Sequence, residues 1–331
     1  MTAPIAVTVA RGPVPESRHE VHAVVVDENG VVASWGDPAR PTMARSAIKA
    51  IQLLPLLRTG AAAAFDVTDD EIALAASSHG AEPDHVERVR GWLHRIGCEE
   101  THLECGPMTP LTAAAAVALH QSGEAPTAVH NCCSGKHTGF LTLARHLDVP
   151  TAGYLQPDHP VQQAVTNAIE VMTGVSTQGQ EPAIDGCGIP VWTLPLQHLA
   201  VGMARLVHHQ DLTRDWSEAS QRAVDALTPP DRAFLVSGTD RAEVIIAQNA
   251  TEPIVSKGGA EGVFMGCLPE RGIGFALKAT DGALRAVEAA TAALLVHMGA
   301  MDPTNQLPRP VRNTLGHQVG EIAVTLEPNV T

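Results

Sequence analysis

Two short apolar runs near the start of the chain predict a β-hairpin. They cover residues 22–26 and 31–35, and Glu28-Asn29-Gly30 separates them. Asn-Gly readily takes the positive φ angles of the tight turns that join antiparallel strands. Apolar positions then follow helical spacing over residues 45–57, where Pro55 is expected to end or kink the helix.

The segment Thr68-Asp69-Asp70-Glu71 predicts the start of a further helix. In such a capping box the Thr hydroxyl and the Glu carboxylate each accept a backbone N–H that the first turn leaves unpaired. We expect this helix to cover residues 72–77 and to end by Gly80. Helical spacing then dominates, with predicted helices over residues 85–96, 113–120, 161–172, 196–208 and 217–227.

Strand patterns return after Pro230, in apolar runs at residues 243–246, 262–268 and 274–279. Residues 283–298 carry a long helical pattern. Residues 302–320 are rich in Pro and Asn, which predicts a surface connection to a last strand at residues 322–326.

Strands at both ends of the chain, with helices between them, predict a mixed α/β fold of the α+β kind. We expect an antiparallel sheet built from the N- and C-terminal segments, with a helical region inserted between them. Residues 1–331 are then a single domain, with a mainly helical subdomain at about 60–235.

The composition indicates which kinds of molecule the protein can bind. The chain has 331 residues, 44% hydrophobic and 18% charged, which is enough apolar material for a sizeable core. Its formal net charge of −14 argues against nucleic acid or an anionic membrane as partner, so a small molecule is expected. We find no export signal or membrane span, and read all six cysteines as reduced thiols, which predicts a cytoplasmic protein.

Lysine is scarce in this chain. Of the 22 basic residues only four are lysines, at positions 49, 136, 257 and 278. Arginine stays protonated in proteins, whereas a buried lysine can become a neutral base or a ligand. Each lysine is therefore a candidate for chemistry.

Ser46 and Lys49 are spaced so that a helix places both side chains on one face. A lysine amine made neutral by desolvation could take the serine proton and produce a nucleophilic alkoxide. A capping serine beside a surface lysine is the alternative. Residues 75–80 likewise end a helix beside Ser78 and His79, either as functional groups or as a helix end whose dipole favours His79.

Cysteines and a lysine occur in two further motifs. Asn131-Cys132-Cys133-Ser134-Gly135-Lys136-His137 precedes a helical run, and Asp185-Gly186-Cys187-Gly188 forms a Gly-rich turn. Two thiolates, a neutral amine and a water could complete the tetrahedral shell of zinc, with His137 and Asp185 as direct or outer ligands. The alternative is a pair of buried structural cysteines, because the usual zinc spacings are absent from the sequence.

Residues 256–262, Ser-Lys-Gly-Gly-Ala-Glu-Gly, form the last motif. Glycines let the backbone approach a ligand, and its N–H groups could form part of an oxyanion hole. The alternative is a turn before the following strand. Lys257, in a chain with few lysines, favours the functional interpretation.

Together, these motifs resemble the asparaginase II family, the rhizobial-type or type III L-asparaginases. The resemblance covers nearly the whole chain and includes residues 11–22, 36–38, 45–52, 78–79, 133–137, 185–188 and 257–262. It implies a fold like that of the serine β-lactamases and glutaminases. It also implies a homodimeric enzyme that hydrolyses L-asparagine.

The family's functional residues carry over by motif. Ser46 with Lys49, and Ser78 with Lys257, are implied to form two catalytic Ser-Lys pairs. Zinc is implied to be held by Cys133, Lys136 and Cys187, supporting substrate binding without generating the nucleophile. Residues expected to bind the substrate are Arg45, His79, Asp185 and Gly258.

The chain departs from the family pattern at two places. Ser78-His79-Gly80-Ala81 stands where Ser-His-Ser-Gly is common, and Cys132 stands where a second asparagine is common. Three rival functions stay open: a glutaminase, a β-lactamase-like serine hydrolase and a non-enzymatic metal-binding sensor. The glutaminase differs only by one methylene of substrate, which a pocket discriminates weakly.

Overall fold

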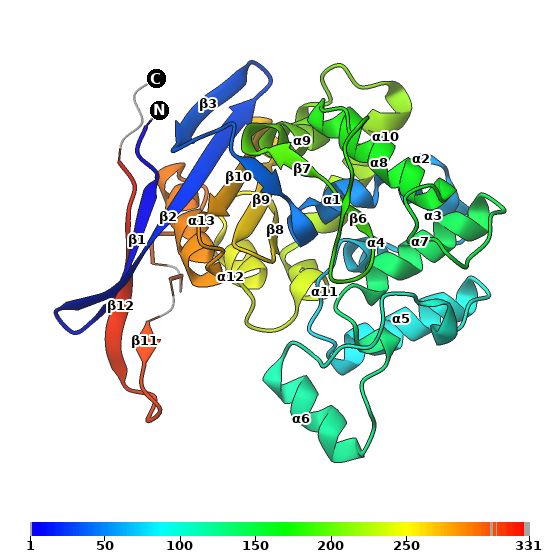
Figure 1. The fold of residues 1–331 in the computed structure, drawn as a ribbon, viewed down its shortest axis with the longest axis horizontal. Helices are drawn as coiled ribbons and strands as arrows, with labels where there is room; N and C mark the ends of the chain where they lie inside the picture. Colours follow the sequence, from blue (N-terminus) through cyan, green and yellow to red (C-terminus); the bar gives the residue numbers. More distant parts are fainter. Residues whose placement is uncertain (1, 305–306, 309, 328–331) are drawn as a thin grey trace. The chain divides into compact units, whose positions relative to one another are not determined.

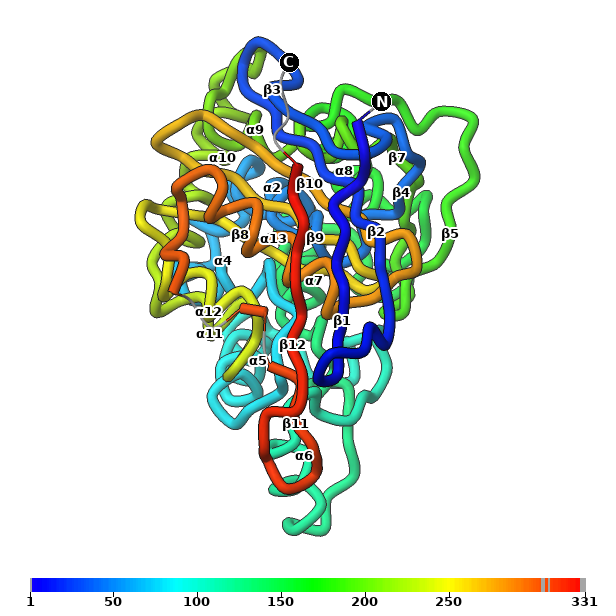
Figure 2. Tube along the Cα trace, turned by 90° about the vertical axis from the view of Figure 1, so that its left-hand side faces the viewer, coloured from blue at the N-terminus to red at the C-terminus, as the bar shows by residue number. Residues whose placement is uncertain are grey.

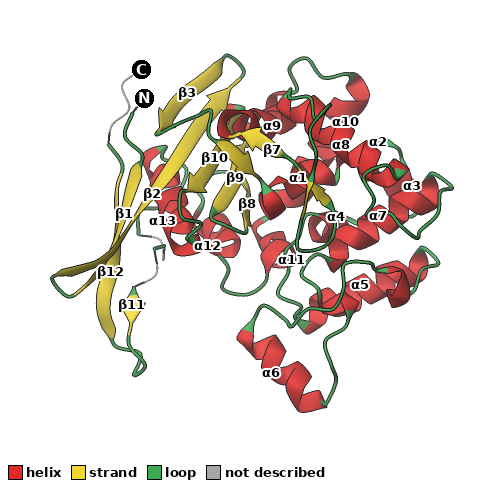
Figure 3. Ribbon diagram, in the orientation of Figure 1, coloured by secondary structure: helices red, strands yellow, loops and turns green. Residues whose placement is uncertain are grey.

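The computed structural model describes residues 2–304, 307–308 and 310–327. The structure is a mixture of helices and antiparallel strands, separated by colour in Figure 3. Its internal packing divides the chain into two compact units. Unit 1 comprises Met1–Ile48, Thr193–Gln210 and Ile245–Thr331, and unit 2 comprises Lys49–Trp192 and Asp211–Val244.

Unit 1 is built on an eight-stranded antiparallel sheet with the order β11-β12-β1-β2-β10-β9-β8, where β3 also pairs with β2. The strands are β1 (Ile5–Arg11), β2 (Val14–Asp27), β3 (Gly30–Trp35), β8 (Val255–Gly259), β9 (Val263–Leu268), β10 (Ile273–Ala279), β11 (Val311–Arg312) and β12 (Gln318–Thr325). The first and last long strands, β1 and β12, lie side by side in Figures 1 and 2, and Ala6 pairs with Thr325. The expected sheet of N- and C-terminal segments is confirmed.

Two helices cover this sheet: α9 (Leu196–His208) and α13 (Leu284–His297). Strand β9 is buried along its whole length. At Gly274 on β10 a Cβ atom would lie only 2.3 Å from the Ala200 carbonyl oxygen of α9, so the glycine permits direct backbone contact. Unit 1 also contains β4 (Pro41–Met43), which pairs with β7 (Thr193–Pro195), and the 3₁₀ turns η1 (Arg45–Ile48) and η5 (Pro269–Arg271).

Unit 2 is mainly helical. Its helices are α1 (Lys49–Gln52), α2 (Leu54–Arg58), α3 (Ala61–Ala64), α4 (Asp69–Ala75), α5 (Pro83–Arg95), α6 (Ala113–Ser122), α7 (Ser134–His146), α8 (Pro160–Thr173), α10 (Arg214–Leu227) and α11 (Ala233–Ser237). Short elements complete it: η2 (Glu100–His102), η3 (Ala128–His130), η4 (Pro230–Arg232), β5 (Ala183–Ile184) and β6 (Pro190–Val191). Helix α7 forms the centre, because residues 134–144 are all buried.

Several predicted elements are confirmed in detail. The hairpin joins β2 and β3 at the expected turn. The capping box at the start of α4 is complete, because Thr68 Oγ1 accepts the Glu71 N–H and the Glu71 carboxylate accepts the Thr68 N–H. Helix α9 has the predicted bounds, but it belongs to the unit that contains the sheet.

Other predictions are wrong. Residues 45–57 do not form one helix but the turn η1 followed by α1 and α2. The helical run is interrupted at Leu53, close to the end or kink expected at Pro55, and Pro55 itself lies in the first turn of α2, where its missing N–H costs no hydrogen bond. Residues 243–246 belong to helix α12 (Ala242–Asn249), because a short apolar run fits a buried helix as well as a strand. Among the described residues, no helix combines the length and apolar character that crossing a bilayer requires.

Candidate functional site

A fully buried lysine lies at the centre of the candidate site in unit 2. Lys49, the first residue of α1, donates from Nζ to Ser78 Oγ at 2.9 Å and to Cys133 Sγ at 3.2 Å. It also donates to the Ser77 carbonyl. These three acceptors match the three hydrogens of an ammonium group. The structure therefore brings Lys49 together with a serine and a cysteine from two of the predicted motifs.

Backbone packing between α4 and α7 brings Ser78 and the Cys133 loop close together. Ser78 lies just beyond the end of α4, where its N–H donates to the Val236 carbonyl at 2.8 Å. The next N–H, of His79, donates to the Cys132 carbonyl at 3.0 Å. At Gly135 a Cβ atom would lie 2.4 Å from the Leu74 carbonyl oxygen, so only glycine lets the start of α7 approach the end of α4 so closely.

The thiols form the next part of the cluster. Cys133 Sγ lies 3.8 Å from Cys132 Sγ, and Lys136 Nζ lies 3.1 Å from Cys187 Sγ. Cys133 and Cys187 also lie close enough for each thiol to shift the pKa of the other. Cys133, Lys136 and Cys187 are all at least nine-tenths buried. The three residues that the sequence assigns to zinc are thus neighbours.

The charges in this cluster are strongly coupled. Hydrogen bonds from Cys132 and Cys187, supported by the cations of Lys49 and Lys136 and opposed by burial, hold the pKa of Cys133 well below its usual value. The bond to Cys133, together with burial, raises the pKa of Cys187. For Lys136 burial favours the neutral amine, but Cys187 and Cys133 outweigh it and raise the pKa. These shifts favour the thiolate at Cys133 and the protonated forms of Cys187 and Lys136.

The donor set of this cluster fits zinc. Two sulfur donors and a nitrogen donor converge in a buried site, which leaves the fourth tetrahedral position for water or substrate. Within the described part of the chain, no group of three or more His, Cys, Asp or Glu side chains could hold a metal. A zinc ion here would therefore need Lys136 as its third protein ligand, and both Lys136 and Cys187 would have to lose a proton to bind it.

His79 is fully buried, and both of its ring nitrogens are engaged. Nδ1 accepts the Ala81 N–H at 3.1 Å, which leaves the ring hydrogen on Nε2, 2.9 Å from Ser134 Oγ. Ser134 donates in turn to the Val129 carbonyl at 2.8 Å. The ring thus connects the Ser78 turn to the Cys133 loop, and the contact of His79 with the substrate stays a prediction.

Asp185 lies in the turn between β5 and β6 that carries Cys187. Its Oδ1 accepts the Gly186 N–H at 2.7 Å, and its carbonyl accepts the Gly188 N–H at 2.9 Å. The half-buried carboxylate is close enough to Lys136 to contribute to its raised pKa. Asp185 thus shapes the loop that carries Cys187, and its contact with the substrate stays a prediction.

Unit 1 contains the remaining predicted residues: Arg45, Ser46, Lys257 and Gly258. Lys257 is buried on β8, and its Nζ donates to the Gly258 carbonyl at 2.7 Å. A Cβ atom at Gly259 would lie 2.9 Å from both the Ala44 carbonyl oxygen and the Ala47 nitrogen, so β8 packs against η1, which carries Ser46. Residues 257–259 belong to strand β8, and the turn considered as the alternative covers only residues 260–262. Arg45, at the start of η1, has a positive φ of 49°.

Comparison with known proteins identifies the family. The profile of the family described as L-asparaginase II matches residues 7–324. The chain belongs to the L-asparaginase II family. No curated protein matches the chain.

Solved structures with detectable similarity are distant from this family member. The native form of a protein called Mglu is 14% identical, with a TM-score of 0.49, covering 86% of this chain and 66% of that one. Its glutamate form is 16% identical, with a TM-score of 0.47, covering 84% of this chain and 60% of that one. A beta-lactamase from Burkholderia ambifaria is 12% identical, with a TM-score of 0.40, covering 86% of this chain and 96% of that one. The chain thus spans just under two thirds of the length of Mglu.

Sequence reasoning missed two residues that support the site of this asparaginase II family member. Tyr154 is fully buried; its hydroxyl lies 2.7 Å from His137 Nδ1 and accepts the Glu104 N–H at 2.9 Å. Asn131 accepts the Cys133 N–H at 2.9 Å and donates to the Cys105 carbonyl at 2.8 Å. The sequence did offer one indication for Tyr154, because it is the only tyrosine in the chain and its position could have been singled out as the scarce lysines were.

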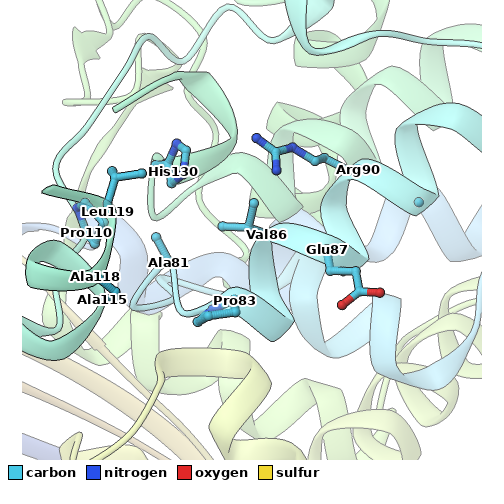
Figure 4. A pocket seen from close by; sticks show the side chains of 11 residues that line it. Ala81, Pro83, Val86, Glu87, Arg90, Pro110, Ala115, Ala118, Leu119 and His130 are labelled. Atoms are coloured by element: carbon cyan, nitrogen blue, oxygen red, sulfur yellow. The ribbon is translucent and has the colours of Figure 1, made fainter. Parts of the chain in front are cut away.

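Unit 2 also contains a cavity of about 480 Å³, shown in Figure 4. Ala81, Val86 and Leu119 line it with apolar surface, and Arg90 and His130 add polar groups. None of the predicted site residues is among those that line it. The cavity is therefore separate from the Lys49 cluster, although Ala81 and His130 lie close in sequence to its motifs.

Proposed function

We propose that this amidohydrolase is an L-asparaginase, which converts L-asparagine and water to L-aspartate and ammonia. The observation that supports this most directly is the buried contact of Lys49 with Ser78. A lysine held beside a serine hydroxyl, away from solvent, has the surroundings in which proton transfer between the two groups is efficient. The family match supports the amide bond as the bond that is broken.

Ser46 is the proposed nucleophile. Its Oγ attacks the side-chain amide carbon while Lys49, as the neutral amine, takes the hydroxyl proton. Lys49 is only three positions after Ser46, which limits their Cα separation to roughly 11 Å whatever conformation the chain takes. Backbone N–H groups hold the oxyanion, and the carbon–nitrogen bond then breaks to leave an ester on Ser46.

Ser78 has the role of a proton relay. Because Ser78 Oγ lies 2.9 Å from Lys49 Nζ, a proton taken by Lys49 can pass through Ser78 to the leaving amine, which departs as ammonia. Ser78 with Lys257 then helps to activate the water that cleaves the ester and frees aspartate. In the opposite assignment Ser78 is acylated, and the same contact lets Lys49 take the proton of Ser78. Mutation of each serine distinguishes the two assignments.

Cys133, Lys136 and Cys187 are the proposed ligands of one zinc ion per subunit. Bound zinc would supply a Lewis acid that polarises or orients a substrate oxygen or nitrogen. A serine nucleophile is already present, so zinc is assigned to substrate binding and not to generating hydroxide. The homodimer and the cytoplasmic location are proposals that rest on the family resemblance and on the sequence.

Ammonia release from a panel of substrates tests the function. We expect L-asparagine to be the best substrate, L-glutamine to react more slowly and a β-lactam to be inert. Faster turnover of glutamine than of asparagine would show that the enzyme is a glutaminase. Opening of the β-lactam ring would show that it is a β-lactamase-like hydrolase. A folded, zinc-loaded protein that releases no ammonia from either amide would favour the metal-binding sensor.

A further inference from the structure

In unit 1 the imidazole of His22, on β2, lies against the guanidinium of Arg40 in a contact between two hydrogen-bond donors. Its Nδ1 accepts the Asp37 N–H at 2.8 Å, so the hydrogen of the neutral ring sits on Nε2. Burial, and after it the charge of Arg40, lowers the pKa of His22, which keeps the ring neutral at pH 7. Nε2 lies 3.4 Å from Arg40 Nη1. Arginine has no acceptor, so two donors meet here without a hydrogen bond.

A second cation lies beside this pair. Lys278, the lysine that the catalytic and zinc motifs do not use, stands directly opposite His22 in the register of β10 and β2. Residues opposed in this way have neighbouring side chains on one face of a sheet. Its Nζ donates to the carbonyls of Glu261 at 2.6 Å and Ala279 at 2.7 Å, which leaves one hydrogen unused. Burial, followed by the charge of Arg40, lowers the pKa of Lys278.

These cations have no carboxylate partner in the described part of the chain: neither Arg40 nor Lys278 forms an ion pair there. Asp37 instead accepts the Ala39 N–H at 2.9 Å, and Asp281 lies 2.6 Å from His19 Nδ1. Glu20 and Glu261 act on His22 and Lys278 respectively only as nearby charges. Two unpaired cations are unexpected in a chain with 36 acidic and 22 basic residues.

We propose that His22, Arg40 and Lys278 bind a small oxyanion, the phosphate or carboxylate group of a small molecule. One anionic oxygen accepting from both His22 Nε2 and Arg40 Nη1 turns the donor–donor contact into two charge-assisted hydrogen bonds. The site is preorganised. A Cβ atom at Gly36 would lie 2.3 Å from His22 Nδ1, which shows how tightly the ring is held, and the Arg40 carbonyl accepts the Leu196 N–H at 3.0 Å.

Calorimetric titration of the full chain tests this site. Inorganic phosphate and acetate are titrated in separate arms, with sodium chloride holding the ionic strength constant. We expect saturable binding of at least one of them, and about tenfold or greater weakening in Arg40→Gln and in Lys278→Gln, because each change removes a charge-assisted hydrogen bond. Tighter phosphate binding would identify a phosphate-bearing ligand, and tighter acetate binding a carboxylate.

Arg11→Gln is the matched control, because Arg11 lies in the same unit but is paired with Glu16 at 3.3 Å. Its anion affinity should stay within about twofold of the wild type, since an exposed pair contributes little. Without anion, Arg40→Gln should have a melting temperature no lower than the wild type, because it relieves the donor–donor contact. Absence of saturable binding, or equal affinity in the wild type and Arg40→Gln, would overturn the proposal.

Discussion

The amine of Lys49 lies 2.9 Å from the hydroxyl of Ser78, a residue 29 positions further along the chain. The family resemblance implies the pairs Ser46 with Lys49 and Ser78 with Lys257. The structure instead shows Lys49 in contact with Ser78 inside unit 2, and the pairing of Lys49 with Ser46 stays a prediction. Each serine therefore has to be tested separately.

Ser46→Ala is expected to lower the rate of ammonia release by about a thousandfold or more, because an alanine offers no oxygen to acylate. Ser78→Ala should also be slow, but should still accumulate acyl-enzyme, because Ser46 remains available for acylation while the activation of water by Ser78 with Lys257 is lost. Mass spectrometry of the protein after mixing with asparagine distinguishes the two.

Ser77→Ala is the matched control for both variants. Its hydroxyl is buried next to Ser78, and within the described residues it has no hydrogen-bond partner. Near-normal activity is expected, because removing an unpaired hydroxyl costs little. If folded Ser46→Ala released ammonia normally while Ser78→Ala was inactive, Ser78 would be the nucleophile.

Local chemistry made part of this fold predictable. Asn29-Gly30 identified the β2–β3 hairpin, and Thr68 with Glu71 identified the start of α4. Each of these signals involves residues that are at most three positions apart in the sequence. The neighbours of Lys49 were not predictable in this way. Ser78 and Cys133 lie 29 and 84 positions away, and only the packing of α4 against α7 brings them to the amine.

The glycines of residues 257–262 show a second respect in which the structure could not be predicted from the sequence. The Gly-rich run indicated a backbone that a ligand could approach, with a turn before the following strand as the alternative. In the structure the backbone of η1 approaches Gly259, so residues 257–259 are strand packed against η1 and residues 260–262 form the turn that follows. A glycine signals that something comes close, but the sequence does not say whether that is a ligand or the protein itself.

Lys49→Arg and Lys257→Arg should each be nearly inactive, although both keep the positive charge. The mechanism requires an amine that gives up its proton, which a guanidinium cannot do at any accessible pH. The measurement is kcat for asparagine together with the unfolding transition, which shows whether the larger side chain is accommodated. A well-folded variant with most of its activity would show that this lysine acts only by its charge.

Cys133→Ala and Cys187→Ala test the zinc proposal. Each should abolish zinc binding and raise KM for asparagine more than it lowers kcat, because zinc is assigned to substrate binding. Elemental analysis of protein purified without chelator gives the occupancy. That occupancy should rise with pH, because the thiols and the Lys136 amine must lose their protons to bind.

Cys98→Ala is the control for the zinc variants, because Cys98 is also a buried free cysteine of unit 2 but lies outside the Lys136 cluster. It should keep both zinc and KM unchanged. Normal asparagine hydrolysis by protein that takes up no zinc at alkaline pH would leave Cys133 and Cys187 as packing or substrate-contact residues.

The last prediction concerns the pH dependence of stability. His79 and His85 are buried and stacked, with ring centroids 5.0 Å apart. Burial, and then the charge of His85, holds the pKa of His79 well below 6.5, and burial also lowers the pKa of His85. The unfolded chain binds a proton at each ring near pH 6.5, and the folded chain only at lower pH. The stability they contribute is therefore fully present above pH 6.5 and is lost as the pH falls below it.

Each ring should steepen the decline in unfolding free energy by up to about 1.4 kcal/mol per pH unit below pH 6.5. Urea unfolding at pH 7.5, 6.0 and 5.0 measures this slope, and His85→Gln should flatten it because an amide does not titrate. His317→Gln, at a position exposed to solvent, should leave the slope unchanged. An equally steep decline in wild type and His85→Gln would mean that other groups govern the acid sensitivity, and that burial of this imidazole does not couple folding to pH.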